Sequence, residues 1–94
     1  MNIYYVELFD YYGELFTDKQ KEYFMDYYFN NLTLQEIADN NNVSKNAVHK
    51  NIKDIVQKLD YYEEKLNLYS NKQKIEKLIE NIDVNIKEQI NELI

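Results

Sequence analysis

The sequence predicts an all-α protein: a helix-turn-helix in a core of three or four helices, with a long recognition helix and an amphipathic C-terminal helical extension. Three observations support this fold class. Apolar side chains recur at three- and four-residue spacing along most of the chain, the period of one helix face. One glycine and no proline leave few sharp breaks. The 94 residues have the size of one compact domain.

The first helix is expected from Ile3, and its apolar residues share one face. These residues are Tyr4, Tyr5, Leu8, Phe9 and Tyr12. Gly13 follows them and is the expected C-terminal cap, because glycine adopts the left-handed conformation readily. The first helix should therefore end at the only glycine in the chain.

The second helix begins after Thr17, which forms a capping box with Gln20. It should run to about Phe29, where Asn30 and Asn31 tolerate the left-handed conformation needed to leave a helix. Four aromatic residues should face inward: Tyr23, Phe24, Tyr27 and Tyr28.

A third, short helix begins after Thr33, which forms a second capping box with Glu36, and should end near Asn40. Its inward residues are Leu34, Ile37 and Ala38. Three consecutive asparagines then favour a turn, and Ser44 can cap a fourth helix of about 20 residues. The fourth helix carries a long apolar stripe: Ala47, Val48, Ile52, Ile55, Val56, Leu59, Tyr62 and Leu66.

The segment 70–94 differs from the segment 1–69, since it lacks aromatic residues and carries a sparse apolar stripe. The stripe residues are Ile75, Leu78, Ile79, Ile82, Ile86, Ile90 and Leu93. Asp83 could cap a break into two helices. An isolated stripe gains little unless it meets another apolar surface. We therefore expect 70–94 to fold back on the domain 1–69 or to form a homodimer interface through the first six of these residues.

The motif in residues 33–53 has the pattern of a helix-turn-helix. Ala38 is small where two helices approach closely, and Val48 and Ile52 anchor the second helix. The remaining side chains at the start of that helix should face outward, and they form the candidate nucleic-acid-binding set: Ser44, Lys45, Asn46, His49, Lys50 and Lys53. Asparagine can read adenine, lysine can contact guanine or phosphate, and serine can donate to phosphate.

The charge pattern bears on possible partners. A net charge of −6 argues against nonspecific coating of nucleic acid, because such binding depends on neutralising phosphates. Residues 31–60, however, balance four acids with four lysines. The absence of cysteine, of a basic N-terminal signal and of a long apolar run favours a cytoplasmic protein that does not insert into membranes.

The sequence favours a protein that is not an enzyme and needs no cofactor or metal, since neither a nucleophile with its base nor a phosphate-binding loop is recognisable. The acidic pairs Glu63–Glu64 and Asp10/Glu14 are interpreted as solvated helix faces. His49 is a lone histidine, and structural zinc needs four ligands. The tyrosines could stack on bases, but their helical spacing favours core packing for most of them.

The chain resembles the YlxM family through an ordered set of short motifs within residues 4–70. They are Phe16–Lys21, Tyr27–Tyr28, Leu32–Ala38, Val43–Val48, Asn51–Lys53 and Tyr62–Leu66. YlxM proteins are small bacterial proteins related to the promoter-reading C-terminal domain of sigma factors. The resemblance implies a cytosolic regulator in the signal recognition particle pathway, since the gene usually lies beside that particle's GTPase.

The chain departs from sigma-like relatives in one respect: every basic residue is lysine, which lacks the planar fork of arginine for bidentate base recognition. Three hypotheses follow. The first is a regulator that contacts signal recognition particle RNA or its GTPase through the helix after Ser44. The second is a dimeric transcription regulator that binds promoter DNA. The third is an adaptor that binds only protein, through its acidic faces.

Overall fold

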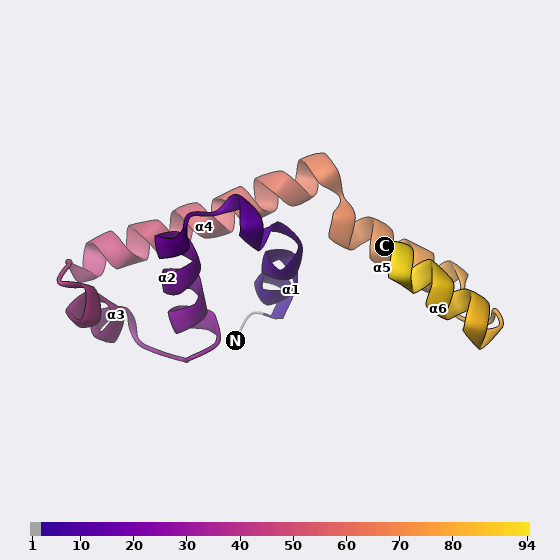
Figure 1. Cartoon of the computed structure of the whole chain (residues 1–94). Helices are drawn as coiled ribbons and strands as arrows, with labels where there is room; N and C mark the ends of the chain where they lie inside the picture. The colour runs from indigo at the N-terminus through magenta and orange to yellow at the C-terminus, as the bar shows by residue number, and fades with distance from the viewer. Residues whose placement is uncertain (1–2) are drawn as a thin grey trace.

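The computed structural model describes residues 3–94, and this range is helical without a strand (Figure 1). The all-α prediction is confirmed. In chain order the elements are α1 (Ile3–Tyr12), the 3-10 turn η1 (Gly13–Leu15), α2 (Asp18–Tyr28), α3 (Leu34–Asn41), α4 (Lys45–Leu66), α5 (Leu68–Leu78) and α6 (Val84–Leu93). The long α4 runs past α3, α2 and α1, which pack against one side of it (Figure 1).

Both predicted capping boxes are present. The Thr17 hydroxyl accepts a hydrogen bond from the backbone N–H of Gln20 at 3.2 Å, and the Gln20 side chain accepts from the N–H of Thr17 at 2.9 Å. Thr33 and Glu36 repeat this exchange, with both distances at 3.1 Å. These bonds satisfy backbone donors that the first helical turn leaves free, so α2 and α3 begin where the sequence predicts.

Asparagine makes the sharp exits from three helices. Asn31, Asn42 and Asn67 have φ values of 55°, 55° and 54°, in the left-handed region that asparagine tolerates better than most residues. The first two lie in the turns predicted from the sequence. Asn67 was not predicted; it separates α4 from α5 and turns the chain away from the core.

Gly13 has a different role from the one predicted. No glycine among residues 3–94 has positive φ, and the chain passes from α1 directly into η1, so the prediction of a left-handed cap is wrong. A side chain at Gly13 would place its Cβ 3.2 Å from Cε1 of Phe9. Glycine therefore suits the close approach of the aromatic ring of Phe9, since a larger residue would push the ring away by a few tenths of an ångström.

The core consists of two clusters that share α4. The first joins α1, α2 and α4 and contains Leu8, Phe9, Tyr12, Phe16, Phe24, Ile55 and Leu59. The second joins α2, α3 and α4 and contains Tyr23, Ile37, Ala38, Val48 and Ile52. The prediction of inward-facing aromatic residues is wrong for Tyr27, which is 37% exposed. On the apolar face expected for α1, Tyr4 is 41% exposed. Because α4 enters both clusters, it fixes the helix-turn-helix to the N-terminal helices.

The helices α5 and α6 form a hairpin that projects beyond the core (Figure 1). The molecule measures 53 × 25 × 20 Å and its radius of gyration is 16.6 Å, against about 12 Å for a compact chain of this length. Asp83 caps α6 by accepting from the N–H of Asn85 at 2.9 Å, as predicted. Of the stripe residues, Ile79 is buried, Ile75 and Ile90 are half-buried, and the exposed ones are Leu78, Ile82, Ile86 and Leu93.

Candidate nucleic-acid interface

A helix-turn-helix is formed by α3, the turn at residues 42–44 and the start of α4. Ala38 is fully buried and packs in the second core cluster with Val48 and Ile52, which explains why a small side chain stands there. The backbone N–H groups of Asn42 and Val43 both donate to the carbonyl of Ala38. These contacts fix the direction in which α4 leaves the turn.

Ser44 begins α4. Its Oγ accepts from the backbone N–H of Ala47 at 3.0 Å, which leaves the hydroxyl proton free to donate elsewhere. The first turn of α4 carries no acidic side chain, and Lys45 occupies its first position. The N-terminus of this 22-residue helix therefore combines the positive end of the helix dipole with a lysine, which favours an anion.

The outward face predicted for the start of α4 is exposed. Its members after Ser44 are Lys45, Asn46, His49, Lys50 and Lys53. None of the ion pairs formed within residues 3–94 involves lysine 45, 50 or 53. The nearest acid on the same helix is Asp54, which is half-buried. The three ammonium groups are thus available to an external anion, in spite of the net negative charge of the chain.

Lys19 lies beside the motif but is already engaged. Its ammonium donates to Oδ1 of Asn41 at the end of α3, lies 5.4 Å from the ring centroid of Tyr23 and is 3.5 Å from a carboxylate oxygen of Glu22. Lys19 therefore supports the position of α3, and the free positive charge of this region belongs to α4.

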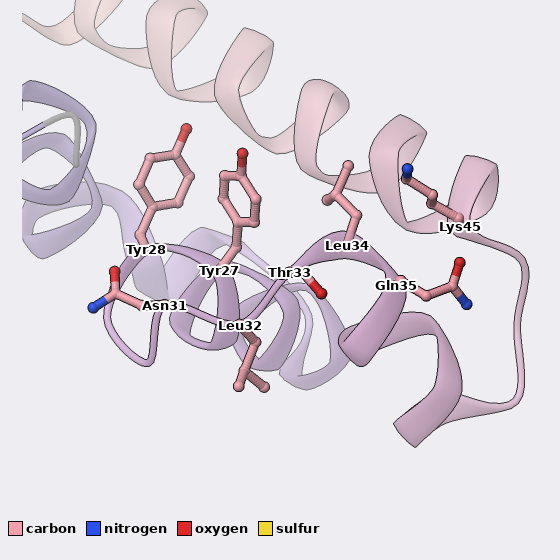
Figure 2. Close-up of a pocket in the computed structure, with 8 residues that line it drawn as sticks. All are labelled: Tyr27, Tyr28, Asn31, Leu32, Thr33, Leu34, Gln35 and Lys45. Carbon is pink, nitrogen blue, oxygen red and sulfur yellow. The ribbon is translucent and has the colours of Figure 1, made fainter.

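An open groove, which the sequence reasoning missed, adjoins the start of α4. It has a volume of about 670 Å³, and we call it the Tyr27 groove; Figure 2 draws its lining residues Tyr27, Tyr28, Asn31, Leu32, Thr33, Leu34, Gln35 and Lys45. The lining comes from the end of α2, the following loop, the start of α3 and the first residue of α4. Lys45 therefore belongs to both the groove and the outward face of α4. Tyr27 was predicted to face inward, so the exposed ring that borders the groove could not be read from the sequence.

Glu63 corrects the interpretation of the acidic pair Glu63–Glu64. Glu64 is exposed, but Glu63 is only 8% exposed. The Glu63 carboxylate accepts from the Tyr12 hydroxyl at 2.6 Å and from the backbone N–H groups of Tyr69 and Ser70 at 3.1 and 3.0 Å. This carboxylate therefore caps the start of α5, where Asn67 offers no side-chain cap.

Tyr12 completes this joint between α1, α4 and α5. Its hydroxyl also accepts from the N–H of Leu68 at 3.1 Å. Burial, followed by the hydrogen bond to Glu63, raises the pKa of Tyr12 to about 12. The joint holds α5 in a fixed direction at the end of α4 opposite the helix-turn-helix. Asp10 and Glu14, in contrast, are exposed as predicted.

His49 is exposed, and within residues 3–94 no group of three or more histidine, cysteine, aspartate or glutamate side chains is arranged to hold a metal ion. None of the helices in the described part of the chain is both long enough and apolar enough to cross a membrane.

Comparison with known proteins identifies a family. Residues 1–94 match the UPF0122 family, described as helix-turn-helix proteins, YlxM / p13 like. A UPF0122 protein of Malacoplasma penetrans is 54% identical over 59 residues, which cover 63% of this chain and 55% of that protein. The chain thus spans about half the length of this relative.

Two further relatives extend the match. A UPF0122 protein of Fusobacterium nucleatum is 49% identical over 70 residues, 74% of this chain and 68% of that protein. One of Listeria innocua is 42% identical over 79 residues, 84% of this chain and 72% of that protein. Together with the helix-turn-helix formed by α3 and α4, these similarities show that the chain belongs to the UPF0122 family of YlxM/p13-like helix-turn-helix proteins.

Proposed function

We propose that this chain is a non-enzymatic cytoplasmic regulator that binds nucleic acid through the exposed face of α4. The observation that carries the proposal is the set of unpaired lysines at positions 45, 50 and 53, at the start of the second helix of a helix-turn-helix. In such motifs this part of the helix contacts base edges and phosphates. Ser44 and Asn46 supply neutral hydrogen-bonding groups beside the lysines.

The proposed setting is the signal recognition particle pathway, where the protein would contact the particle's RNA or its GTPase. The resemblance to YlxM proteins supports this setting, and family membership supports the use of the helix-turn-helix. The all-lysine composition favours RNA over sequence-specific reading of duplex DNA, because bidentate recognition of guanine is best made by arginine.

A dimeric transcription regulator is the second candidate. It is favoured by the exposed apolar side chains on the α5–α6 hairpin, which a second copy of the chain could cover: Leu78, Ile82, Val84, Ile86 and Leu93. A symmetric dimer would present two copies of α4 to half-sites about one helical turn of DNA apart. The homodimer itself is part of the proposal in either setting.

The experiment is fluorescence anisotropy of labelled signal recognition particle RNA and of a mixed-sequence DNA duplex, each titrated with the protein across a salt series. Salt-sensitive binding to the RNA well above binding to the duplex supports the particle-associated role. A preference for the duplex supports the transcription regulator. No binding to either at low salt contradicts the proposal and favours a protein-only adaptor.

A further inference from the structure

The Tyr27 groove lies beside the proposed nucleic-acid face and shares Lys45 with it. Its volume of about 670 Å³ falls within the range of roughly 300–1,000 Å³ that small-molecule sites have. Lys45, the first residue of α4, lines the groove, so a ligand bound by the lysines of α4 could also enter it. The chemistry of its lining indicates what that ligand group is.

The aromatic wall of the groove is rigidly supported. The Tyr27 ring packs at 80° to the ring of Tyr28 with centroids 5.1 Å apart, and Tyr28 stacks on the buried Phe24 at 4.5 Å. Tyr27 itself is 37% exposed. A ring that is fixed on one side and open on the other can stack on a flat group with little loss of side-chain entropy.

The polar wall complements a nucleotide. Gln35 and Asn31 bring amides, which can donate to and accept from the edge of a base. Lys45 brings an ammonium group that takes part in no ion pair within the described chain. In Figure 2 this ammonium extends from α4 toward Leu34, and the hydroxyl groups of both tyrosines point to the same side as Leu34. Aromatic, amide and cationic residues thus line the groove, and Figure 2 draws the amides of Asn31 and Gln35 on opposite sides of it.

We propose that the Tyr27 groove binds one unpaired nucleotide, whose base stacks on Tyr27 while its phosphate lies at Lys45. The nucleotide must be unpaired because both faces of a base inside a duplex are covered by its neighbours. This inference rests on the proposed function, since it takes the strand to be one that the face of α4 already binds. It assigns the protein to strands with a loop, bulge or free end rather than to continuous duplexes.

The test uses the full chain and three fluorescein-labelled probes of one sequence: single-stranded RNA, its RNA duplex and single-stranded DNA. Tyr27→Ala should weaken binding of the single-stranded RNA about 5- to 100-fold. The same variant should weaken binding of the duplex by less than about twofold. Tyr27→Phe keeps the ring and should stay within about twofold of the wild type. Tyr61→Ala is the matched control, because Tyr61 is also exposed and has a lysine, Lys65, over its ring at 5.7 Å.

A second measurement does not depend on a variant. A single-stranded RNA probe carrying one central 4-thiouridine should, on irradiation, crosslink to Tyr27, which lies in the tryptic peptide 22–45 identified by mass spectrometry. Equal binding of the RNA and DNA single strands would support an unpaired nucleotide recognised without its 2′-hydroxyl, and stronger binding of RNA would support one recognised with it.

Two results separate the inference from the proposed function. If the wild type binds nucleic acid in a salt-sensitive way but Tyr27→Ala weakens single strand and duplex equally or not at all, the groove is not a nucleotide site. If the wild type binds none of the three probes at low salt, and neither signal recognition particle RNA nor the DNA duplex, the proposed function itself fails, and the inference fails with it.

Discussion

At the residue scale, Tyr12 and Glu63 form the buried polar centre of the molecule. The Tyr12 hydroxyl donates to Glu63 and accepts from Leu68, while the carboxylate of Glu63 also caps Tyr69 and Ser70. Two side chains thus satisfy three backbone N–H groups at the start of α5. Each of the two side chains needs the other, because removing one leaves buried groups without partners.

The substitution Tyr12→Phe should lower the free energy of unfolding by about 1–3 kcal/mol, since it leaves the N–H of Leu68 without an acceptor and removes a donor from Glu63. Urea denaturation followed by circular dichroism measures the change. Tyr61→Phe, at an exposed ring, is the control and should be nearly neutral. If Tyr12→Phe lowers the free energy of unfolding no more than Tyr61→Phe does, the joint does not stabilise the fold.

The same joint predicts a loss of stability at high pH. The pKa of Tyr12 is about 12 in the folded chain and 10.0 when unperturbed, so the unfolded state releases the proton first. The stabilisation is present below pH 10 and falls as the pH rises toward 12, by roughly 2–3 kcal/mol in all. Unfolding free energies of the wild type and Tyr12→Phe should therefore converge from pH 9 to pH 11.5; a gap that does not narrow contradicts this account.

Residues whose partners are close in sequence could be predicted, and residues whose partners are distant could not. Thr17 and Thr33 find their capping partners three residues later, so the local sequence was sufficient. Glu63 meets Tyr12 across 51 positions, and before the fold is known its carboxylate resembles any other on a helix surface. The Tyr27 groove also needs three helices in place before it exists.

At the element scale, the turn between α3 and α4 sets the direction of the proposed binding helix. Asn42 has φ 55°, and its N–H caps α3 by donating to Ala38. This turn was predicted from the sequence, because three consecutive asparagines favour a turn and Ala38 is small enough for two helices to approach closely. The left-handed exit at Asn67 was not predicted, although the apolar stripe of the fourth helix ended at Leu66, because a single asparagine gives no comparable signal.

The left-handed turn at Asn42 predicts opposite effects of two substitutions. Asn42→Val should destabilise the fold by about 1–2 kcal/mol, because a β-branched side chain is strained at positive φ. Asn42→Gly should be close to neutral. Thermal unfolding of the two variants measures the difference, and Asn40→Val, in the last turn of α3, is the control for the propensity of valine alone. Equal midpoints for Asn42→Val and Asn42→Gly would contradict the strained turn.

At the scale of the whole molecule, the two proposed working surfaces lie at opposite ends. The helix-turn-helix occupies one end of α4, and the α5–α6 hairpin extends from the other (Figure 1). The capped turn at Asp83 and the apolar stripe of the hairpin were readable from the sequence. The sequence could not predict which stripe residues the hairpin buries, because their burial depends on how α5 and α6 pack on each other. The structure leaves Leu78, Ile82 and Ile86 exposed.

The exposed stripe predicts a dimer that charge would disrupt. The double variant Ile82→Asp with Ile86→Asp should be monomeric by light scattering, because two carboxylates would be buried in an apolar interface. Leu15→Asp, at an exposed apolar residue of η1, is the control and should keep the mass of the wild type. A double variant that stays dimeric would place the interface elsewhere, and a monomeric wild type would contradict the dimer.

The most direct test of the central claim, that the start of α4 binds nucleic acid, is the salt dependence of binding. A triple variant in which Lys45, Lys50 and Lys53 are all changed to glutamine should reduce the slope of log K, the binding constant, against log salt concentration by about 2–3. In a matched control variant, Lys58, Lys74 and Lys77, which are also exposed, are changed to glutamine. This variant should keep the wild-type slope. If the first variant keeps the wild-type slope, or the second loses as much, the face of α4 is not the binding surface.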